Sequence, residues 1–163
     1  ARQAVSSICS VPQPPPNVSV VHDTAPTVFS QVGGMAFFES LVDAFYDGVV
    51  DDAVLWPLYP DQDDLAGARD RLTLFLAQYW GGPSTYMDER GHPRLRMRHF
   101  PYSIGALERD RWLVHMAGAV AKVAAERAVP AGVAEQLMSY FVTAAEHLRN
   151  DLGPSGAPAE PGR

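Results

Sequence analysis

The chain has 163 residues, of which 47% are hydrophobic and 20% charged, and its formal net charge is −6. This composition excludes a disordered chain, and the single cysteine, Cys9, excludes a disulfide framework and a Cys-rich zinc site. No apolar run approaches the ~20 residues that span a bilayer, no secretory signal is evident, and the acidic balance disfavours nucleic acid. We therefore expect a cytoplasmic protein without membrane or nucleic-acid partners.

Proline is concentrated near the two ends of the chain. Residues 1–26 hold five of the 14 prolines, and residues 151–163 hold three more. Because proline lacks an amide donor and restricts the residue before it, both segments are predicted to be extended or disordered tails. Residues 27–150 are then predicted to form one domain, which is long enough to bury its own core.

Apolar residues recur with helical spacing through most of this domain. After a short helix predicted near 27–32 and the corner at Gly33-Gly34, a stripe with spacings of three and four predicts a helix that ends near Asp51-Asp52. The stripe consists of Phe38, Leu41, Val42, Phe45 and Val49.

Three further stripes follow in the chain. A helix is predicted from the Asp63-Asp64 cap to Tyr79, where Gly81-Gly82-Pro83 ends it. The other two stripes lie at 112–123 and 133–148, the latter preceded by Pro130. Neither strand alternation nor an Asn-Gly or Asp-Gly hairpin signal is present, so the fold class is predicted to be all-α.

Residues 83–102 lack an apolar stripe and are predicted to be a loop, which at this length is usually functional or disordered. From Arg90 to His99 there are four arginines and no acidic residue. Such a run is either a solvated surface or a site for carboxylates or phosphates, which guanidinium groups bind through paired donors. His99, at the end of the run, is a candidate axial ligand of haem iron, although other ligands also carry carboxylates.

Several motifs in fixed order resemble one family. They are Ala44-Phe45-Tyr46, Leu58-Tyr59-Pro60, Asp63-Asp64-Leu65-Ala66-Gly67-Ala68, YWGGP at 79–83, GHPRLRMRH at 91–99 and ERDRWL at 108–113. Over about residues 27–150 the chain resembles the group II truncated haemoglobins of bacteria (the trHbO-like type). The resemblance implies a truncated globin, a two-over-two helical sandwich around haem b (iron protoporphyrin IX).

The resemblance also assigns roles to single residues around the iron. His99 matches the proximal histidine, whose Nε2 would bind iron while Nδ1–H donates to a backbone carbonyl. Tyr46, Tyr59 and Trp112 match the distal donors to the bound ligand. Ala68 stands where animal globins carry a distal histidine, so it offers no donor and leaves room for ligand entry.

The haem itself needs cations for its propionates and apolar walls for its ring. Arg98 and Arg71 are predicted to bind the propionates. The residues predicted to pack on the haem are Leu72, Phe75, Tyr79 and Met116, with Leu76 and Phe100 as further candidates. His92, His115 and His147 are interpreted as structural or solvent-facing.

Three functions follow from these residues. The first is reversible binding of oxygen for storage, transport or sensing, with NO, CO, cyanide and sulfide as further ligands. The second is a nitric oxide dioxygenase or weak peroxidase with an external reductase, although no distal histidine or carboxylate is evident to support peroxidase chemistry. The third is a helical module without haem that binds acidic small molecules through the arginine run. Each of these three functions is compatible with a monomer or a homodimer.

Overall fold

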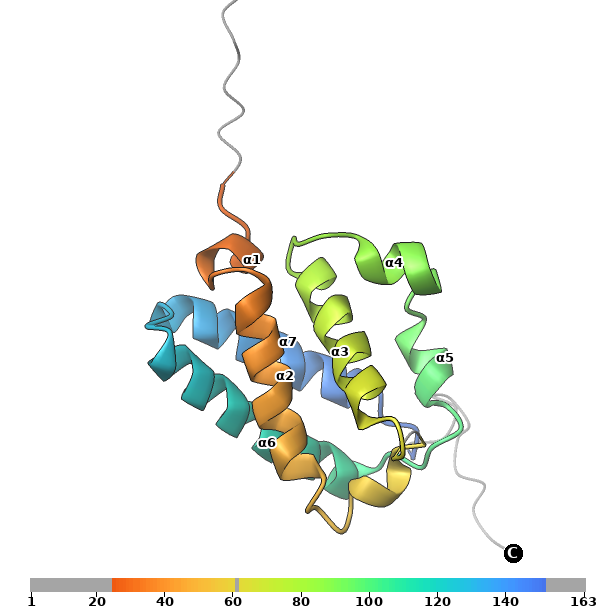
Figure 1. The fold of residues 1–163 in the computed structure, drawn as a ribbon. Helices are drawn as coiled ribbons and strands as arrows, with labels where there is room; N and C mark the ends of the chain where they lie inside the picture. Colours follow the sequence, from red (N-terminus) through yellow and green to blue (C-terminus); the bar gives the residue numbers. More distant parts are fainter. Residues whose placement is uncertain (1–24, 61, 152–163) are drawn as a thin grey trace, which may run out of the picture.

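A computed structural model describes residues 25–60 and 62–151 (Figure 1). The predicted tails at 1–26 and 151–163 lie almost wholly outside the described residues. In the described part of the chain there is no strand, which confirms the all-α prediction. The helices are α1 (Val28–Gln31), α2 (Met35–Val49), the 3₁₀ turn η1 (Trp56–Leu58), α3 (Leu65–Tyr79), α4 (Thr85–Arg90), α5 (Leu95–His99), α6 (Ala106–Glu126) and α7 (Ala131–His147).

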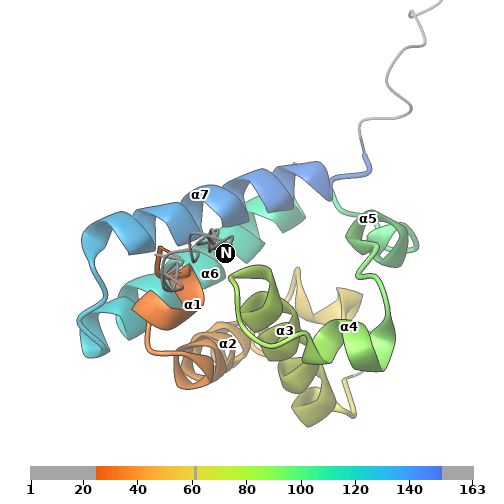
Figure 2. The ribbon, with the colours of Figure 1, turned by 90° about the horizontal axis from the view of Figure 1, so that it is seen from above.

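The four long helices form two layers, with α2 beside α3 in one and α6 beside α7 in the other (Figures 1 and 2). The apolar face of α2 is buried between the layers, and Phe38, Leu41 and Phe45 have no exposed surface. Met116 from α6 and Phe141 from α7 belong to the same core. Each such side chain contributes about 1.5–3 kcal/mol by leaving water. The predicted two-over-two helical sandwich is therefore confirmed.

Local hydrogen bonds explain where α3 begins and ends. The Asp64 carboxylate accepts the backbone N–H of Gly67 at 3.0 Å and caps the first turn. At the other end Gly81 has a φ of +96°, and a Cβ there would lie 2.7 Å from the Thr27 side chain. Glycine at this position therefore lets the chain turn sharply against α1.

The prediction of a loop at 83–102 is wrong, because α4 and α5 lie within it. Each helix has six residues or fewer, which is too short to show a 3.6-residue period in the sequence. Asn150, which follows α7, holds the far end of α5 in place. Its side-chain amide donates to the carbonyls of Tyr102 at 2.5 Å and His99 at 3.4 Å. The site of His99 thus depends on a residue 51 positions away.

Over residues 25–60 and 62–151, no helix combines the length and the apolar character needed to cross a bilayer.

We predict that Leu41→Ala lowers the free energy of unfolding by about 2–5 kcal/mol, since it leaves a cavity between the layers. Val142→Ala on α7 is the control, because Val142 is 49% exposed, and it should cost less than about 0.5 kcal/mol. Urea denaturation followed by circular dichroism measures both. Equal losses at the two positions would contradict this description of the core.

Candidate functional site

A cavity of about 390 Å³ lies where α3, α5, α6 and the η1 segment meet. Its walls are mostly aromatic and aliphatic side chains, with a few polar groups among them. Ten residues predicted for the haem site line it: Tyr46, Tyr59, Ala68, Arg71, Leu72, Phe75, Leu76, Arg98, His99 and Trp112. The fold thus brings together in one cavity residues from five separate segments of the chain.

Two residues predicted to pack on the haem, Met116 and Tyr79, are not among those that line the cavity. Met116 is one turn beyond Trp112 on α6, and its side chain is fully buried in the core between the layers. Tyr79, at the end of α3, is 53% exposed and stacks on Tyr140 with ring centroids 4.1 Å apart. Tyr140 lines the cavity in its place, and burial raises its pKa to about 12, so its hydroxyl stays protonated. Phe100 is exposed as well.

The hydrogen bond of His99 defines which of its ring nitrogens is available. Nδ1 lies 2.7 Å from the backbone carbonyl oxygen of Leu95, one turn earlier on α5. A carbonyl only accepts, so in the neutral ring Nδ1 carries the proton and Nε2 holds a free lone pair. This is the tautomer that ligates a metal through Nε2. In the part of the chain that the structure describes, no cluster of three or more His, Cys, Asp or Glu side chains could hold a metal ion.

Three aromatic side chains with polar hydrogens meet at another part of the cavity wall. Tyr46 comes from α2, Tyr59 from the segment after η1 and Trp112 from α6, and the two tyrosine rings lie 5.7 Å apart. Desolvation and the nearby Tyr46 raise the pKa of Tyr59 far above its usual value, although a side-chain hydrogen bond with Trp112 acts in the opposite direction. An indole N–H can only donate, so Trp112 is the donor of this hydrogen bond and the Tyr59 oxygen is its acceptor.

Three arginines line the wall, and one of them, Arg109, is paired with Asp110 and Glu146. Arg98 donates through Nε to the carbonyl of Pro93 at 2.7 Å, which fixes the side chain beside α5. Arg71 on α3 pairs with Asp64 at 3.2 Å. An apolar cavity with one imidazole in the ligating tautomer and three guanidinium groups fits a flat, apolar metal complex with two carboxylates. The residues present therefore fit haem.

The sequence did not reveal a buried carboxylate that connects the segments bearing the aromatic donors. Asp52 follows α2, and its side chain has no exposed surface. One oxygen accepts from Arg111 at 2.7 Å and lies 2.7 Å from Nε2 of His115, both on α6. The other oxygen accepts the backbone N–H groups of Val54 at 2.9 Å and Leu55 at 3.1 Å. Asp52 thus ties the segment that leads to Tyr59 onto the helix that carries Trp112.

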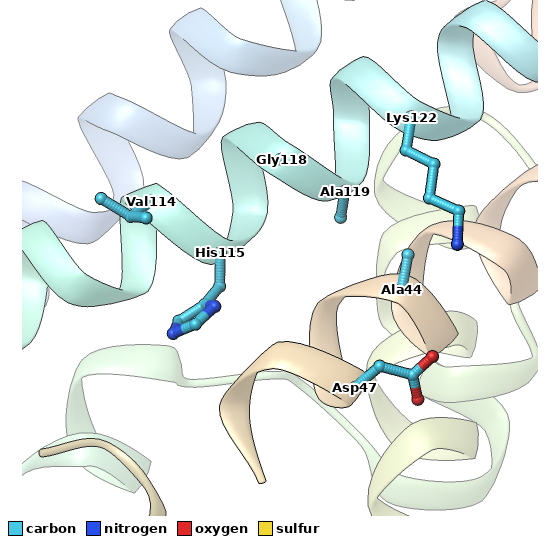
Figure 3. Close-up of a pocket in the computed structure, with 7 residues that line it drawn as sticks. All are labelled: Ala44, Asp47, Val114, His115, Gly118, Ala119 and Lys122. Carbon is cyan, nitrogen blue, oxygen red and sulfur yellow. The ribbon is translucent and has the colours of Figure 1, made fainter. Parts of the chain in front are cut away.

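Burial alone would raise the pKa of Asp52, but the hydrogen bonds from His115, Arg111 and the two backbone amides outweigh it. The pKa is held well below its usual range, so the carboxylate stays charged. His115 reaches this carboxylate from the α6 face that also bears Ala119 and Lys122 (Figure 3). The His115 ring can pack closely against α2 because residue 48 is a glycine, and a Cβ at Gly48 would lie 2.4 Å from the ring. His115, interpreted from the sequence as structural, therefore has a defined partner.

The helical sandwich and its histidine-bearing cavity are those of a globin. A family model described as bacterial-like globin matches residues 27–147. A curated relative, the Group 2 truncated hemoglobin YjbI of Bacillus subtilis, is 36% identical over 117 residues, which are 72% of this chain and 84% of the relative.

Solved structures give the same result. A thermostable haemoglobin from Thermobifida fusca has 53% identity and a TM-score of 0.73, and the match covers 78% of this chain and 100% of that one. The group II truncated haemoglobin of Bacillus anthracis has 34% identity and a TM-score of 0.69, with 80% and 96% covered. The chain belongs to the bacterial-like globin family and is a group II truncated haemoglobin. The family binds small gaseous ligands at haem.

We predict that Asp52→Asn lowers the free energy of unfolding at neutral pH by about 2 kcal/mol, because it removes charged hydrogen bonds in a buried place. The folded-state pKa of Asp52 lies below the unfolded value, so the stabilisation is present above about pH 4 and is lost as the pH falls toward the folded value. Urea denaturation of both proteins at neutral and acidic pH measures the difference. The account is contradicted if the difference does not shrink below about pH 4.

Proposed function

We propose that this protein holds haem b through Nε2 of His99 and binds oxygen reversibly, with Tyr59, Trp112 and Tyr46 supplying hydrogen bonds to the ligand. Bound haem supplies an iron atom with one coordination position open to a small ligand. The observation that carries the proposal is that one cavity contains both a histidine in the ligating tautomer and the polar aromatic side chains of Tyr59, Trp112 and Tyr46.

His99 does two things in this proposal. The Leu95 carbonyl accepts its Nδ1–H at 2.7 Å, which fixes the orientation of the ring and makes Nε2 more basic. Arg98 and Arg71 line the same cavity and are proposed to bind the propionates through paired donors. Leu72 and Phe75 on α3 provide the apolar wall that excludes water from the ring.

The donor pair gives selectivity for ligands that accept a hydrogen bond. Trp112 donates to the Tyr59 oxygen, and a hydroxyl that accepts one hydrogen bond becomes a stronger donor in the next. The raised pKa keeps the Tyr59 proton in place, so the hydroxyl donates to oxygen rather than competing with it as an anion. Ala68 offers neither a donor nor bulk, which leaves ligand stabilisation to these aromatic residues. A relative of known structure is described as the truncated oxygen-avid haemoglobin of Bacillus subtilis.

The peroxidase alternative finds no support in the cavity wall. Among the described residues that line the cavity, Glu108 is the one carboxylate, and its Oε2 accepts the N–H of Gly105 at 2.8 Å. It therefore caps the start of α6 and is not free to move protons on a ligand. Nitric oxide dioxygenation would use the same donors as oxygen binding and differs in needing a supply of electrons.

We predict that His99→Gly abolishes stoichiometric haem binding, because it removes the only imidazole among the residues that line the described cavity. The measurement is the Soret absorbance during titration of the purified chain with haem. His92→Gly is the matched control, since His92 is exposed and does not line the cavity. If both variants bind haem as the unsubstituted chain does, His99 is not the ligand.

We predict that Tyr59→Phe increases the rate of oxygen release by about tenfold or more, since one hydrogen bond to a partly charged acceptor is lost. Stopped-flow displacement of oxygen measures the rate. Tyr79→Phe removes the same hydroxyl outside the cavity and should leave the rate unchanged. Equal rates for Tyr59→Phe and the unsubstituted chain would exclude Tyr59 as a donor.

A further inference from the structure

The arginines of the described residues divide into two groups by their partners. Those elsewhere in the fold are neutralised apart from Arg127, which donates to the Ser40 hydroxyl, since Arg69, Arg71, Arg109, Arg111 and Arg149 form ion pairs with carboxylates. The arginines from 90 to 98 form none with the described residues. Arg98 and Arg96 donate to the backbone carbonyls of Pro93 and His147. The positive charge on this part of the surface is therefore not neutralised by ion pairs, although Arg90 also has a Coulombic interaction with Asp64.

The same part of the surface exposes large apolar side chains. Leu95, Arg98 and His99 turn one side of α5 toward the cavity. Met97 on α5 and Phe100 at its C-terminal cap lie three residues apart, do not line the cavity, and are 67% and 77% exposed. The α4 and α5 helices lie at one edge of the molecule, outside the two layers (Figures 1 and 2). We name the α5 patch the surface formed by Arg90, Arg94, Arg96, Met97 and Phe100.

The composition of the α5 patch is that of a protein-binding surface. Methionine, phenylalanine and arginine are enriched in protein interfaces, and an apolar centre with a charged rim is their usual arrangement. Three arginines without ion pairs favour a partner with acidic groups, because they attract it electrostatically during association and match its charge in the complex. Asp88 and Glu89 on α4 directly precede Arg90 and disfavour a continuous polyanion such as nucleic acid or an anionic membrane. A folded protein can place its carboxylates at the arginines alone.

We propose that the α5 patch is the docking surface for an acidic protein that carries single electrons. The α5 patch lies next to the cavity. Phe100 directly follows His99, and one side of α5 lines the cavity while the opposite side belongs to the patch. A carrier seated there is separated from the cavity by one short helix. This inference rests on the proposed function: ferric haem gains one electron, the carrier loses one, and the ferrous state that binds oxygen is restored.

The test uses the full, haem-loaded chain with an acidic [2Fe–2S] ferredoxin as the probe. The double variant Arg90→Glu with Arg94→Glu reverses two charges of the α5 patch. The double variant Lys122→Glu with Arg127→Glu is the matched control, since it makes the same change in net charge on exposed positions of α6 and its end. Calorimetry measures ferredoxin affinity at low and high ionic strength, and stopped-flow absorbance measures ferric-haem reduction by reduced ferredoxin and by dithionite.

We expect the α5 variant to bind ferredoxin at least about tenfold more weakly at low salt, and to be reduced correspondingly more slowly, while the control stays within about twofold. Reduction by dithionite should be the same in all three proteins. Equal weakening in both variants, no ferredoxin binding by the unsubstituted chain, or binding of phosphatidylserine vesicles through the same arginines would overturn the proposal. Soret absorbance and oxygen release report the proposed function separately, so a chain that binds oxygen but not ferredoxin contradicts only the docking surface.

Discussion

The arrangement of the cavity wall formed by Tyr46, Tyr59 and Trp112 depends on one buried carboxylate. Asp52 sits at the end of α2 and accepts hydrogen bonds from Arg111 and His115 of α6 and from the backbone of Val54 and Leu55. Burying a charge costs free energy unless the charge is fully paired, so few other arrangements of α6 and the segment after α2 would keep Asp52 satisfied. Tyr46, Tyr59 and Trp112 stand on the three segments that Asp52 joins, so the relative positions of these three side chains follow from that contact.

The part of the cavity wall that bears His99 is also held by hydrogen bonds, one of them from a distant segment. The carbonyl of Leu95 fixes the His99 ring, and Asn150 ties the end of α5 to the segment after α7. Helices as short as α5 are not stable alone, so this tether determines where the imidazole lies. The inner side of α5 then serves the cavity, and its outer side is left with the unpaired arginines and exposed Met97 and Phe100. One five-residue helix therefore connects the cofactor site with the surface.

The long helices were predictable because their apolar stripes run for several turns, and Phe38 to Val49 and Leu65 to Tyr79 are helical as the spacing predicts. The resemblance to truncated haemoglobins directed attention to His99, Tyr59 and Trp112, which all line the cavity. The short helices α4 and α5 gave no periodic signal. The partners of Asp52 lie 59 and 63 residues away in the sequence, so no local pattern could reveal them. The position of Met116 was also not predictable from the sequence. It is one helical turn beyond Trp112 on α6, yet Trp112 lines the cavity and Met116 lies in the core.

The most direct test is to measure oxygen release after Asp52→Asn in two backgrounds, the unsubstituted chain and Tyr59→Phe. If Asp52 acts by holding Tyr59 and Trp112 together, its substitution speeds release in the first background and has little further effect in the second, where the donor is already gone. Unchanged release in the first background, or the same acceleration in both, would contradict the claim that the buried carboxylate positions the donors.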